Sequence, residues 1–195
     1  MSVHKKVPVP LENGVTATFV TFDFATPEKE HIALLFPGWD SSPVPLVRIH
    51  SECLTGDVFA SMRCDCHAQL HEAIDTMTKD GGIILYLRQE GRGIGLKAKL
   101  DAYDLQIRDD LDTYEANLAL GKPEDMRDYS VAAQMLKDLD IPKVRLLTNN
   151  LDKANSLRAH GIEVSEIQRT TVHKTSANHD YLDAKLRHGH LLTGT

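Results

Sequence analysis

The hydrophobic pattern of the chain changes near residue 50. Before that point, short runs rich in β-branched and aromatic residues are separated by turn formers such as ENG and PGWDSSP, and the runs read VTATFVTF, HIALLF and PLVRIH. Runs of this length and composition between turn formers are typical of strands. The first part of the chain is therefore predicted to be rich in β-strands.

The second part of the chain mixes helical and strand patterns. Apolar residues recur at helical spacing from Leu70 onward, and a Gly-Gly pair then precedes the apolar run IILYLR. A second helical face begins at Val131 and is followed by the run VRLLT, a polar Asn149-Asn150 turn, a helix that ends near Gly161 and the run IEVSEI. This order predicts a helix, a buried strand, a further helix and a right-handed βαβ unit.

These elements predict the fold class α/β, as a single domain over residues 1–195 with mixed β-sheets and with the strand-rich N-terminal half packed on a C-terminal βαβ half. A hydrophobic content of 42% and this length suit one globular domain with a core. Ligands of βαβ units bind beyond the carboxyl ends of the strands. The expected binding region therefore includes residues 148–153 and 89–95.

Charge and composition exclude several classes of function. A net charge of -6 argues against general binding of nucleic acids, which requires a basic surface, so a phosphate ligand must be held by local cations. The first residues lack the apolar run of a secretory signal, and no later segment is apolar for long enough to span a bilayer. We therefore expect a cytoplasmic protein with no nucleic-acid partner and no membrane partner.

The cysteines of the chain, Cys53, Cys64 and Cys66, all lie within one short segment. In a reducing compartment such a cluster favours a metal site over disulfides, and an odd number leaves one thiol unpaired. Thiolates suit zinc, and three protein ligands leave one tetrahedral position for water, whose pKa falls to about 7 on the metal. The pattern predicts a hydrolytic zinc site, with a closed structural site completed by His67 or His71 as the alternative.

Two further segments carry candidate chemistry. QEGRGIGL directly follows a predicted strand, and its glycines allow a ligand to approach the backbone closely. Within it, Glu90 can accept hydrogen bonds and Arg92 suits bidentate phosphate recognition. DTYEANLALG is followed by Asp125 and Arg127, a pair that by its spacing alone reads as a surface ion pair.

Together these segments resemble the GTP cyclohydrolase II family of riboflavin biosynthesis. The matching motifs are RIHSECLTGDVF, RCDC, LYLRQEGRGIGL, DTYEANLALG, D-M-RDY, VRLLTNN and a terminal YLDAK with GHLL, and they run in order from Arg48 to Leu192. The resemblance implies zinc-dependent hydrolysis of GTP that opens the imidazole ring at C8. The implied products are formate, pyrophosphate and a diaminopyrimidine ribosyl phosphate.

The resemblance also assigns roles to individual residues. The implied ligands of one Zn²⁺ per chain are Cys53, Cys64 and Cys66, and Mg²⁺ would accompany the substrate triphosphate. The implied catalytic residues are Asp125 as proton acceptor, Arg127 as nucleophile at the α-phosphorus and Tyr103 near the metal. The implied GTP contacts are Arg48, His50, Ser51, Glu52, Gln69, Glu90, Gly91, Arg92, Thr113, Thr148 and Lys153.

Some of these roles have alternatives. A guanidinium stays protonated up to about pH 12, so Arg127 needs Asp125 as a base or else only stabilises charge. Tyr103 shares a helical face with two leucines, and core packing is its alternative role. His67 stands where relatives commonly have glycine, and we expect it outside the metal shell because adjacent residues rarely both reach one ion from a helix start.

The resemblance further implies a homodimer with GTP as its small-molecule substrate. Many relatives carry a dihydroxybutanone phosphate synthase domain before the cyclohydrolase, and 195 residues leave no space for it, so one activity is expected. The alternative functions are a catalytically silent, zinc-stabilised nucleotide-binding protein and a paralogue that feeds a specialised metabolite or stops at the formylated intermediate. The presence of every implied catalytic residue favours the enzyme.

Overall fold

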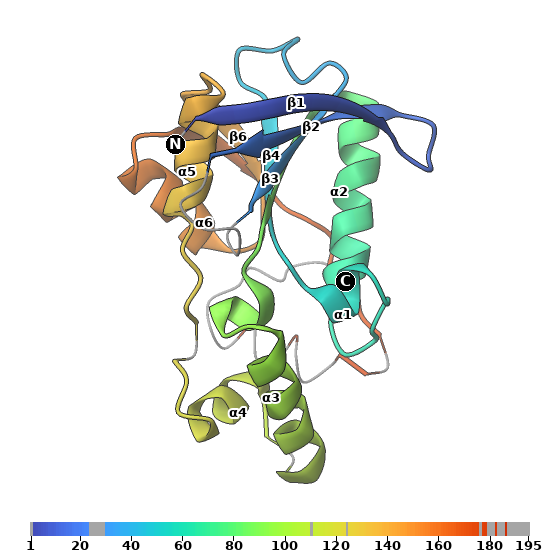
Figure 1. The fold of residues 1–195 in the computed structure, drawn as a ribbon, viewed down its shortest axis with the longest axis vertical. Helices are drawn as coiled ribbons and strands as arrows, with labels where there is room; N and C mark the ends of the chain where they lie inside the picture. The colour runs from blue at the N-terminus through green and yellow to red at the C-terminus, as the bar shows by residue number, and fades with distance from the viewer. Residues whose placement is uncertain are drawn as a thin grey trace. The chain divides into compact units, whose positions relative to one another are not determined.

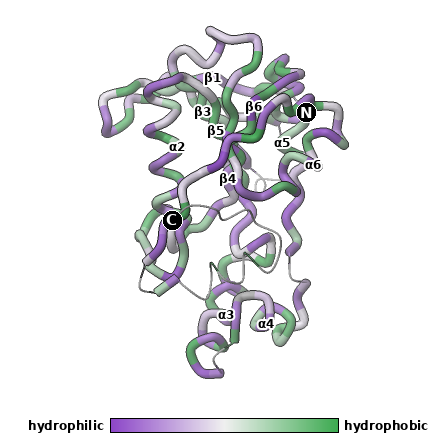
Figure 2. Tube along the Cα trace, turned by 180° about the vertical axis from the view of Figure 1, so that it is seen from behind, coloured by the Kyte–Doolittle hydropathy of each residue, from purple (hydrophilic) through white to green (hydrophobic). Residues whose placement is uncertain are grey.

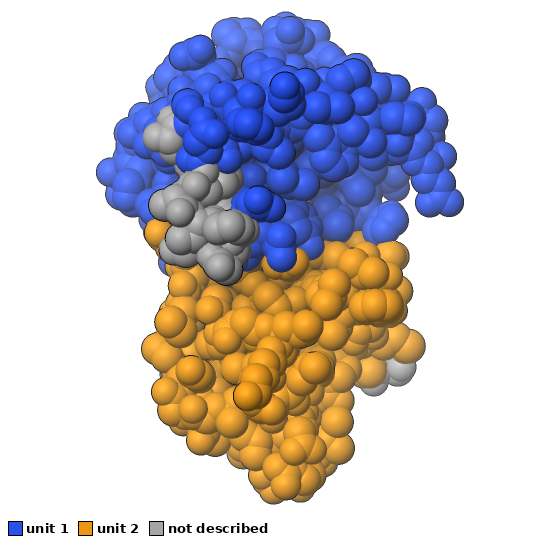
Figure 3. Space-filling view, viewed as in Figure 1, with its two compact units in different colours: residues 1–50, 70–88, 129–170 blue, residues 51–69, 89–128, 171–195 orange. Residues whose placement is uncertain are grey.

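A computed structural model describes residues 2–23, 30–109, 111–123, 125–175, 177, 178, 182 and 186. The chain divides into two compact units, which Figure 3 colours separately. Unit 1 comprises Met1–His50, Leu70–Arg88 and Tyr129–Thr170. Unit 2 comprises Ser51–Gln69, Gln89–Asp128 and Thr171–Thr195. The expectation of a single domain stays a prediction.

Among the described residues, strands form one seven-stranded sheet in the order β1-β2-β3-β5-β4-β6-β7 (Figure 1). The strands are β1 (Val3–Pro10), β2 (Thr16–Phe22), β3 (Ile32–Phe36), β4 (Leu46–Ser51), β5 (Gly82–Leu87), β6 (Lys143–Leu147) and β7 (Glu163–Gln168). The pairs β1–β2, β2–β3 and β3–β5 are antiparallel, whereas β4–β6 and β6–β7 are parallel. The α/β class with mixed strand directions is thus confirmed, and the strand-rich half and the βαβ half share one sheet.

Strand β1 is the one strand of this sheet that the sequence pattern did not predict. It contains Pro8 and Pro10, which have no backbone N–H to donate and are therefore confined to edge strands or bulges. The sheet order places β1 at an edge, where one side of the strand needs no ladder partner. The edge position explains why these prolines are compatible with a strand.

Helices cover both faces of the sheet in unit 1. They are α2 (Cys66–Asp80) on one face and α5 (Ser130–Asp138) and α6 (Leu151–Ala159) on the other (Figure 1). Along β5, Ile83 and Leu85 belong to the core under α5 and α6, whereas Ile84 packs with Met77 of α2. Successive side chains of a strand point to opposite faces of the sheet, which explains why neighbouring residues of β5 belong to different cores. Figure 2 shows the hydrophobic colouring of β3 and β5.

The turn between α2 and β5 depends on two glycines. Gly81 has φ +72° and Gly82 has φ +148°, values that side chains rarely allow. A Cβ on Gly82 would lie 2.1 Å from Met77 Sδ and 2.8 Å from the Leu46 carbonyl oxygen, so a side chain there would force the Met77 side chain and the backbone of β4 to shift. The Gly-Gly break in the sequence thus marks a close helix–strand turn.

The described helices of unit 2 range from 4 residues in α1 to 14 residues in α3. They are α1 (Leu54–Asp57), the 3-10 helix η2 (Glu90–Gly93), α3 (Leu96–Asp109) and α4 (Thr113–Ala119). Helix α4 begins with a capping box, in which Asp112 Oδ1 accepts from the Tyr114 and Glu115 amides at 2.8 and 2.9 Å and Glu115 Oε2 accepts from the Asp112 amide at 2.8 Å. Across the described ranges, no helix has the length and apolar character needed to cross a bilayer.

Candidate metal and phosphate site

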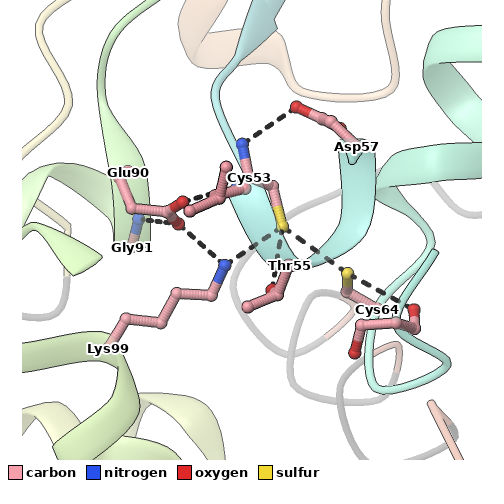
Figure 4. A network of polar contacts seen from close by, with 9 residues as sticks. Cys53, Thr55, Asp57, Cys64, Glu90, Gly91 and Lys99 are labelled. Atoms are coloured by element: carbon pink, nitrogen blue, oxygen red, sulfur yellow. Dashed lines mark hydrogen bonds and ion pairs between the residues drawn. The ribbon is translucent and has the colours of Figure 1, made fainter. Parts of the chain in front are cut away.

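The three cysteines of unit 2 bring their sulfur atoms together. Cys53 immediately precedes α1, Cys64 lies in the following loop and Cys66 begins α2. All three Sγ atoms lie within 4.8 Å of one another, and those of Cys53 and Cys64 are 3.7 Å apart (Figure 4). Two thiolates at tetrahedral positions about 2.3 Å from one zinc ion stand about 3.8 Å apart. The three side chains therefore fit one metal ion.

Gly56 of α1 shapes the space that the sulfur atoms occupy. A Cβ at this position would lie 2.9 Å from Cys64 Sγ, 3.0 Å from Cys53 Sγ and 3.0 Å from Cys66 Cβ. Real Cβ atoms essentially never approach another heavy atom more closely than 3.0 Å, so any side chain at this position would move the ligand atoms. His67 and His71 are both described, and neither belongs to the group of potential ligands that the cysteines form.

Gly56→Ala is expected to lower zinc affinity by about ten- to a hundredfold, the range typical of changes next to metal ligands. The added methyl group would push the three cysteines away from the arrangement that suits one ion. Competition with a chromophoric chelator measures the affinity. Gly121→Ala is the control, because a Cβ there meets nothing within 4 Å although φ is +66°, so it strains the backbone without crowding the sulfur atoms. Equal affinities of the two variants would contradict the role of Gly56.

The metal-free thiols have very different proton affinities. Hydrogen bonds from Cys64 and Cys66, together with Lys99, hold the pKa of the Cys53 thiol far below its usual range despite burial. The hydrogen bond with Cys53 raises the pKa of Cys64 to about 11. Hydrogen bonds with Cys53 and Cys64 and burial also raise the pKa of Cys66. One thiolate and two thiols are therefore expected at neutral pH.

Zinc binding near pH 7 is consequently expected to release two protons, from Cys64 and Cys66, whose raised pKa values keep them protonated in the metal-free protein. The apparent affinity should fall about a hundredfold for each unit of acidification between about pH 8 and pH 6, because protons compete with the metal. Chelator competition at several pH values measures this slope. A slope of about tenfold would mean one released proton and a slope of about a thousandfold would mean three, and either would contradict the assignment.

Tyr103 of α3 lies beside the cysteine cluster in a polar setting. The Arg63 guanidinium carbon lies 5.0 Å from the centroid of its ring, and Lys99 Nζ lies 5.7 Å from it. The Tyr103 hydroxyl is hydrogen-bonded to Thr55. Thr55 Oγ1 is in turn 3.7 Å from Cys53 Sγ. Burial raises the pKa of Tyr103, so the phenol keeps its proton at neutral pH. These polar neighbours do not match a role confined to core packing.

Arg92 is held in an unusual backbone conformation. It has φ 60° and ψ 31°, in the left-handed region that residues other than glycine seldom adopt. Its guanidinium carbon lies 4.2 Å from the centroid of the Tyr114 ring, and Nη1 donates to the Tyr114 hydroxyl. The Met126 amide donates to the Arg92 carbonyl at 2.9 Å, and a Cβ on Gly93 would lie 3.0 Å from the Met126 carbonyl oxygen. Both the backbone and the side chain of Arg92 are thus fixed.

Asp125 lies between two arginines. Arg127 donates to it from Nε, at 2.9 Å to Oδ1, and from Nη2 to Oδ2, while Arg92 Nη1 is 3.7 Å from Oδ2. Burial alone would raise the pKa of Asp125, but the hydrogen bonds and charge of Arg127, with the charge of Arg92, outweigh burial and lower it. Asp125 is therefore a carboxylate at neutral pH, and it forms ion pairs with both arginines.

The other predicted nucleotide contacts of unit 2 have varied surroundings. Gln69 Nε2 donates to Asp65 Oδ2 at 2.7 Å, and Ser51 Oγ is buried without a hydrogen-bond partner among the described residues. Glu52 is half-buried, and Thr113 is the first residue of α4. Glu90 and Gly91 belong to η2, where the Gly91 amide donates to Glu90 Oε1 at 2.8 Å.

Four predicted contacts lie in unit 1. Arg48 and Lys153 are both buried. Arg48 donates to a main-chain carbonyl of β6 at 3.3 Å, and Lys153 donates to a main-chain carbonyl of β4 at 2.8 Å. Thr148 is buried directly after β6, and the His50 ring stacks on Tyr86 with centroids 5.5 Å apart. Two buried positive charges, one on β4 and one on α6, suit an anionic ligand.

Sequence reasoning did not identify three residues of the site in unit 2. Gly56 and Tyr114 lie inside quoted motifs, but no spacing rule shows that one faces three cysteines and the other stacks on Arg92. Lys99 lies 46 residues from Cys53, whose sulfur it contacts. The motifs YLDAK and GHLL, apart from Leu182, lie outside the described residues.

Comparison with known proteins gives a consistent result. The family model described as GTP cyclohydrolase II matches residues 2–169. "GTP cyclohydrolase-2" of Aliivibrio fischeri (strain MJ11) is 51% identical over 182 residues, covering 93% of this chain and 91% of that protein, and the protein of the same name from Vibrio cholerae serotype O1 has the same values. "Riboflavin biosynthesis protein RibBA" of Bacillus cytotoxicus is 47% identical over 189 residues, covering 96% of this chain but 47% of that protein.

Proposed function

The chain belongs to the GTP cyclohydrolase II family, and from this membership we propose that it hydrolyses GTP to formate, pyrophosphate and a diaminopyrimidine ribosyl phosphate. Two waters are consumed at C8 of the guanine ring and one at the α-phosphorus. The observation that carries the proposal is the cysteine cluster of unit 2, whose three sulfur atoms fit one metal ion around Gly56. Unit 2 also contains the arginine pair around Asp125, which suits a triphosphate.

We assign the metal to Cys53, Cys64 and Cys66 as one Zn²⁺ per chain. When bound, zinc activates water for hydrolysis at neutral pH and polarises the bond under attack. Tyr103 supplies a neutral phenol beside this centre, because burial raises its pKa and Thr55 orients its hydroxyl. It can therefore donate a hydrogen bond or a proton to a ring nitrogen that gains charge as the imidazole opens.

We assign the release of pyrophosphate at the α-phosphorus to Arg92, Arg127 and Asp125, with Mg²⁺ bound to the triphosphate. Asp125 orients Arg127 through two parallel hydrogen bonds. Its lowered pKa makes Asp125 a weak base. These properties favour stabilisation of the developing phosphate charge over covalent attack by Arg127. The covalent route implied by the family resemblance is the second candidate.

The family resemblance supplies the remaining proposed contacts with GTP. We propose that Arg48, His50, Thr148 and Lys153 of unit 1 contribute to GTP binding. The contacts proposed for unit 2 are Ser51, Glu52, Gln69, Glu90, Gly91, Arg92 and Thr113. We further propose a cytoplasmic homodimer that acts in riboflavin biosynthesis, as the name of the Bacillus cytotoxicus relative suggests for that protein.

Mass spectrometry of the products tests the proposal. Zinc-loaded protein is incubated with GTP and Mg²⁺, and formate and pyrophosphate are quantified beside the nucleotide product. Equal amounts of formate, pyrophosphate and diaminopyrimidine ribosyl phosphate are expected. A formylated product would mean that hydrolysis stops after ring opening. Unchanged GTP with zinc present would favour the alternative, a nucleotide-binding protein without turnover.

A further inference from the structure

A buried ion pair lies against the cysteine cluster of unit 2. Lys99 of α3 and Glu90 of η2 are 7% and 8% exposed, and Lys99 Nζ donates to Glu90 Oε1 at 2.7 Å. The same Nζ donates to Cys53 Sγ at 3.1 Å, as Figure 4 shows. Burying two charges costs considerable desolvation free energy, and a pair at this position therefore calls for a specific reason.

Glu90 fixes the direction in which Lys99 points. Its Oε1 also accepts from the Gly91 amide at 2.8 Å, and its Oε2 accepts from the Leu54 amide at 2.6 Å. Both carboxylate oxygens are thus bonded within the protein, to η2, to α3 and to the residue after Cys53. These bonds distinguish Glu90 from Arg92, whose guanidinium is directed at Tyr114 and Asp125.

The backbone of Cys53 is held independently of its sulfur. The Cys53 amide donates to Asp57 Oδ2 at 2.9 Å, so the start of α1 is fixed from one side by Asp57 and from the other by Glu90 through Leu54. With the main chain held in this way, the hydrogen bond from Lys99 Nζ acts on the sulfur atom itself, and the same Nζ lies 5.7 Å from the centroid of the Tyr103 ring. The 2.7 Å contact between Lys99 Nζ and the Glu90 carboxylate is the geometry of an ammonium–carboxylate ion pair.

We infer that Lys99, oriented by Glu90, is a positioning residue that donates a charged hydrogen bond to the Cys53 sulfur and thereby controls how strongly that sulfur donates electrons to the metal. The inference rests on the proposed metal site. Three thiolates around a divalent ion leave one excess negative charge, and Lys99 places a cationic donor directly on one of these sulfur atoms, while Glu90 balances the charge of Lys99 itself. A thiolate that accepts a hydrogen bond is a weaker donor, which leaves the metal a stronger Lewis acid. Glu90 acts through Lys99 and not as a ligand.

The test uses Co²⁺ in place of zinc, because thiolate ligation gives cobalt an intense sulfur-to-metal charge-transfer band. In Lys99→Met the Cys53 sulfur should become a stronger donor, and the band should move to longer wavelength. The kcat of the zinc enzyme for formate release should fall by about ten- to a hundredfold, with the KM for GTP unchanged. Glu90→Gln, which loosens Lys99 but keeps its size, should shift the band in the same direction by less.

Two further variants serve as controls. Lys99→Arg keeps a cationic donor and should largely restore the band position and kcat, whereas a purely structural role of Lys99 would not be rescued by charge. Lys97→Met removes an exposed lysine from the same helix and should match the parent protein in both readouts. If Lys99→Met fails to fold, the band shift between Glu90→Gln and the parent decides instead.

The outcomes separate the inference from the proposed function. A cobalt band that stays in place in Lys99→Met and in Glu90→Gln, with the metal bound, would overturn the inference whether or not GTP is hydrolysed. A parent protein that binds cobalt but releases no formate from GTP would overturn the proposed function, while the band positions would still decide the role of Lys99. A shifted band with an unchanged kcat would overturn the claim that the hydrogen bond serves catalysis.

Discussion

Cys64→Ser is expected to remove the bound metal and to lower formate release from GTP by at least about a thousandfold. A neutral serine hydroxyl is a poor replacement for a thiolate on zinc, and two remaining cysteines do not make a stable site. Water at C8 then lacks the activation that brings its pKa to about 7. Elemental analysis gives the zinc content of the purified variant, and the formate assay gives its activity.

Pyrophosphate release should fall less than formate release in this variant. The residues proposed to act on the phosphates, Arg92, Asp125 and Arg127, contribute no ligand to the cysteine cluster. Val58→Ala is the matched control, because Val58 lies in the same segment between two ligands and its side chain is exposed. It should keep its zinc and its activity. Full formate release by Cys64→Ser without zinc would contradict the metal site.

Local patterns were sufficient to predict most strands and helices of unit 1. The β-branched and aromatic composition of VTATFVTF between turn formers and the helical spacing from Leu70 are both local features of the sequence. Strand β1 was not predicted, because prolines follow two of its valines and argue against a strand in the sequence. Its place at the sheet edge depends on pairing with β2. The pairing of β3 with β5 and of β4 with β6 joins segments far apart in the chain, which no local pattern indicates.

The chemistry of the site was easier to predict than its geometry. Thiols clustered in one short segment predict a metal site from ligand preference alone, and the structure brings the three sulfur atoms together. The sequence does not show that Gly56 leaves room for the three sulfur atoms or that Lys99 reaches Cys53, because both contacts depend on the tertiary structure. The capping box at Asp112, in contrast, has a local signal in the sequence, D-x-x-E, which is sufficient to predict the start of α4.

The two roles open to Arg127 predict different results for two substitutions. Arg127→Met should lower pyrophosphate release by about a thousandfold or more under either role, the scale on which a catalytic arginine acts at a phosphate. Arg127→Lys separates the roles, because lysine keeps the positive charge but loses the paired hydrogen bonds to Asp125. If Arg127 stabilises charge, the lysine variant should keep about a tenth to a hundredth of the parent rate.

Two further measurements distinguish the two roles of Arg127. They are the rate of pyrophosphate release by Asp125→Asn and the mass of the parent enzyme quenched during turnover. Asp125 holds two arginines and has a lowered pKa, so its carboxylate orients Arg127 rather than removing its proton. The asparagine variant should therefore be less impaired than Arg127→Met, and the quenched parent enzyme should carry no guanylyl adduct. A covalent nucleophile requires the opposite pattern, with Asp125→Asn and Arg127→Lys both as inactive as Arg127→Met and an adduct on the parent whose added mass is that of GMP less one water. That pattern would assign Asp125 as the base despite its lowered pKa, because a guanidinium cannot attack phosphorus before it loses a proton.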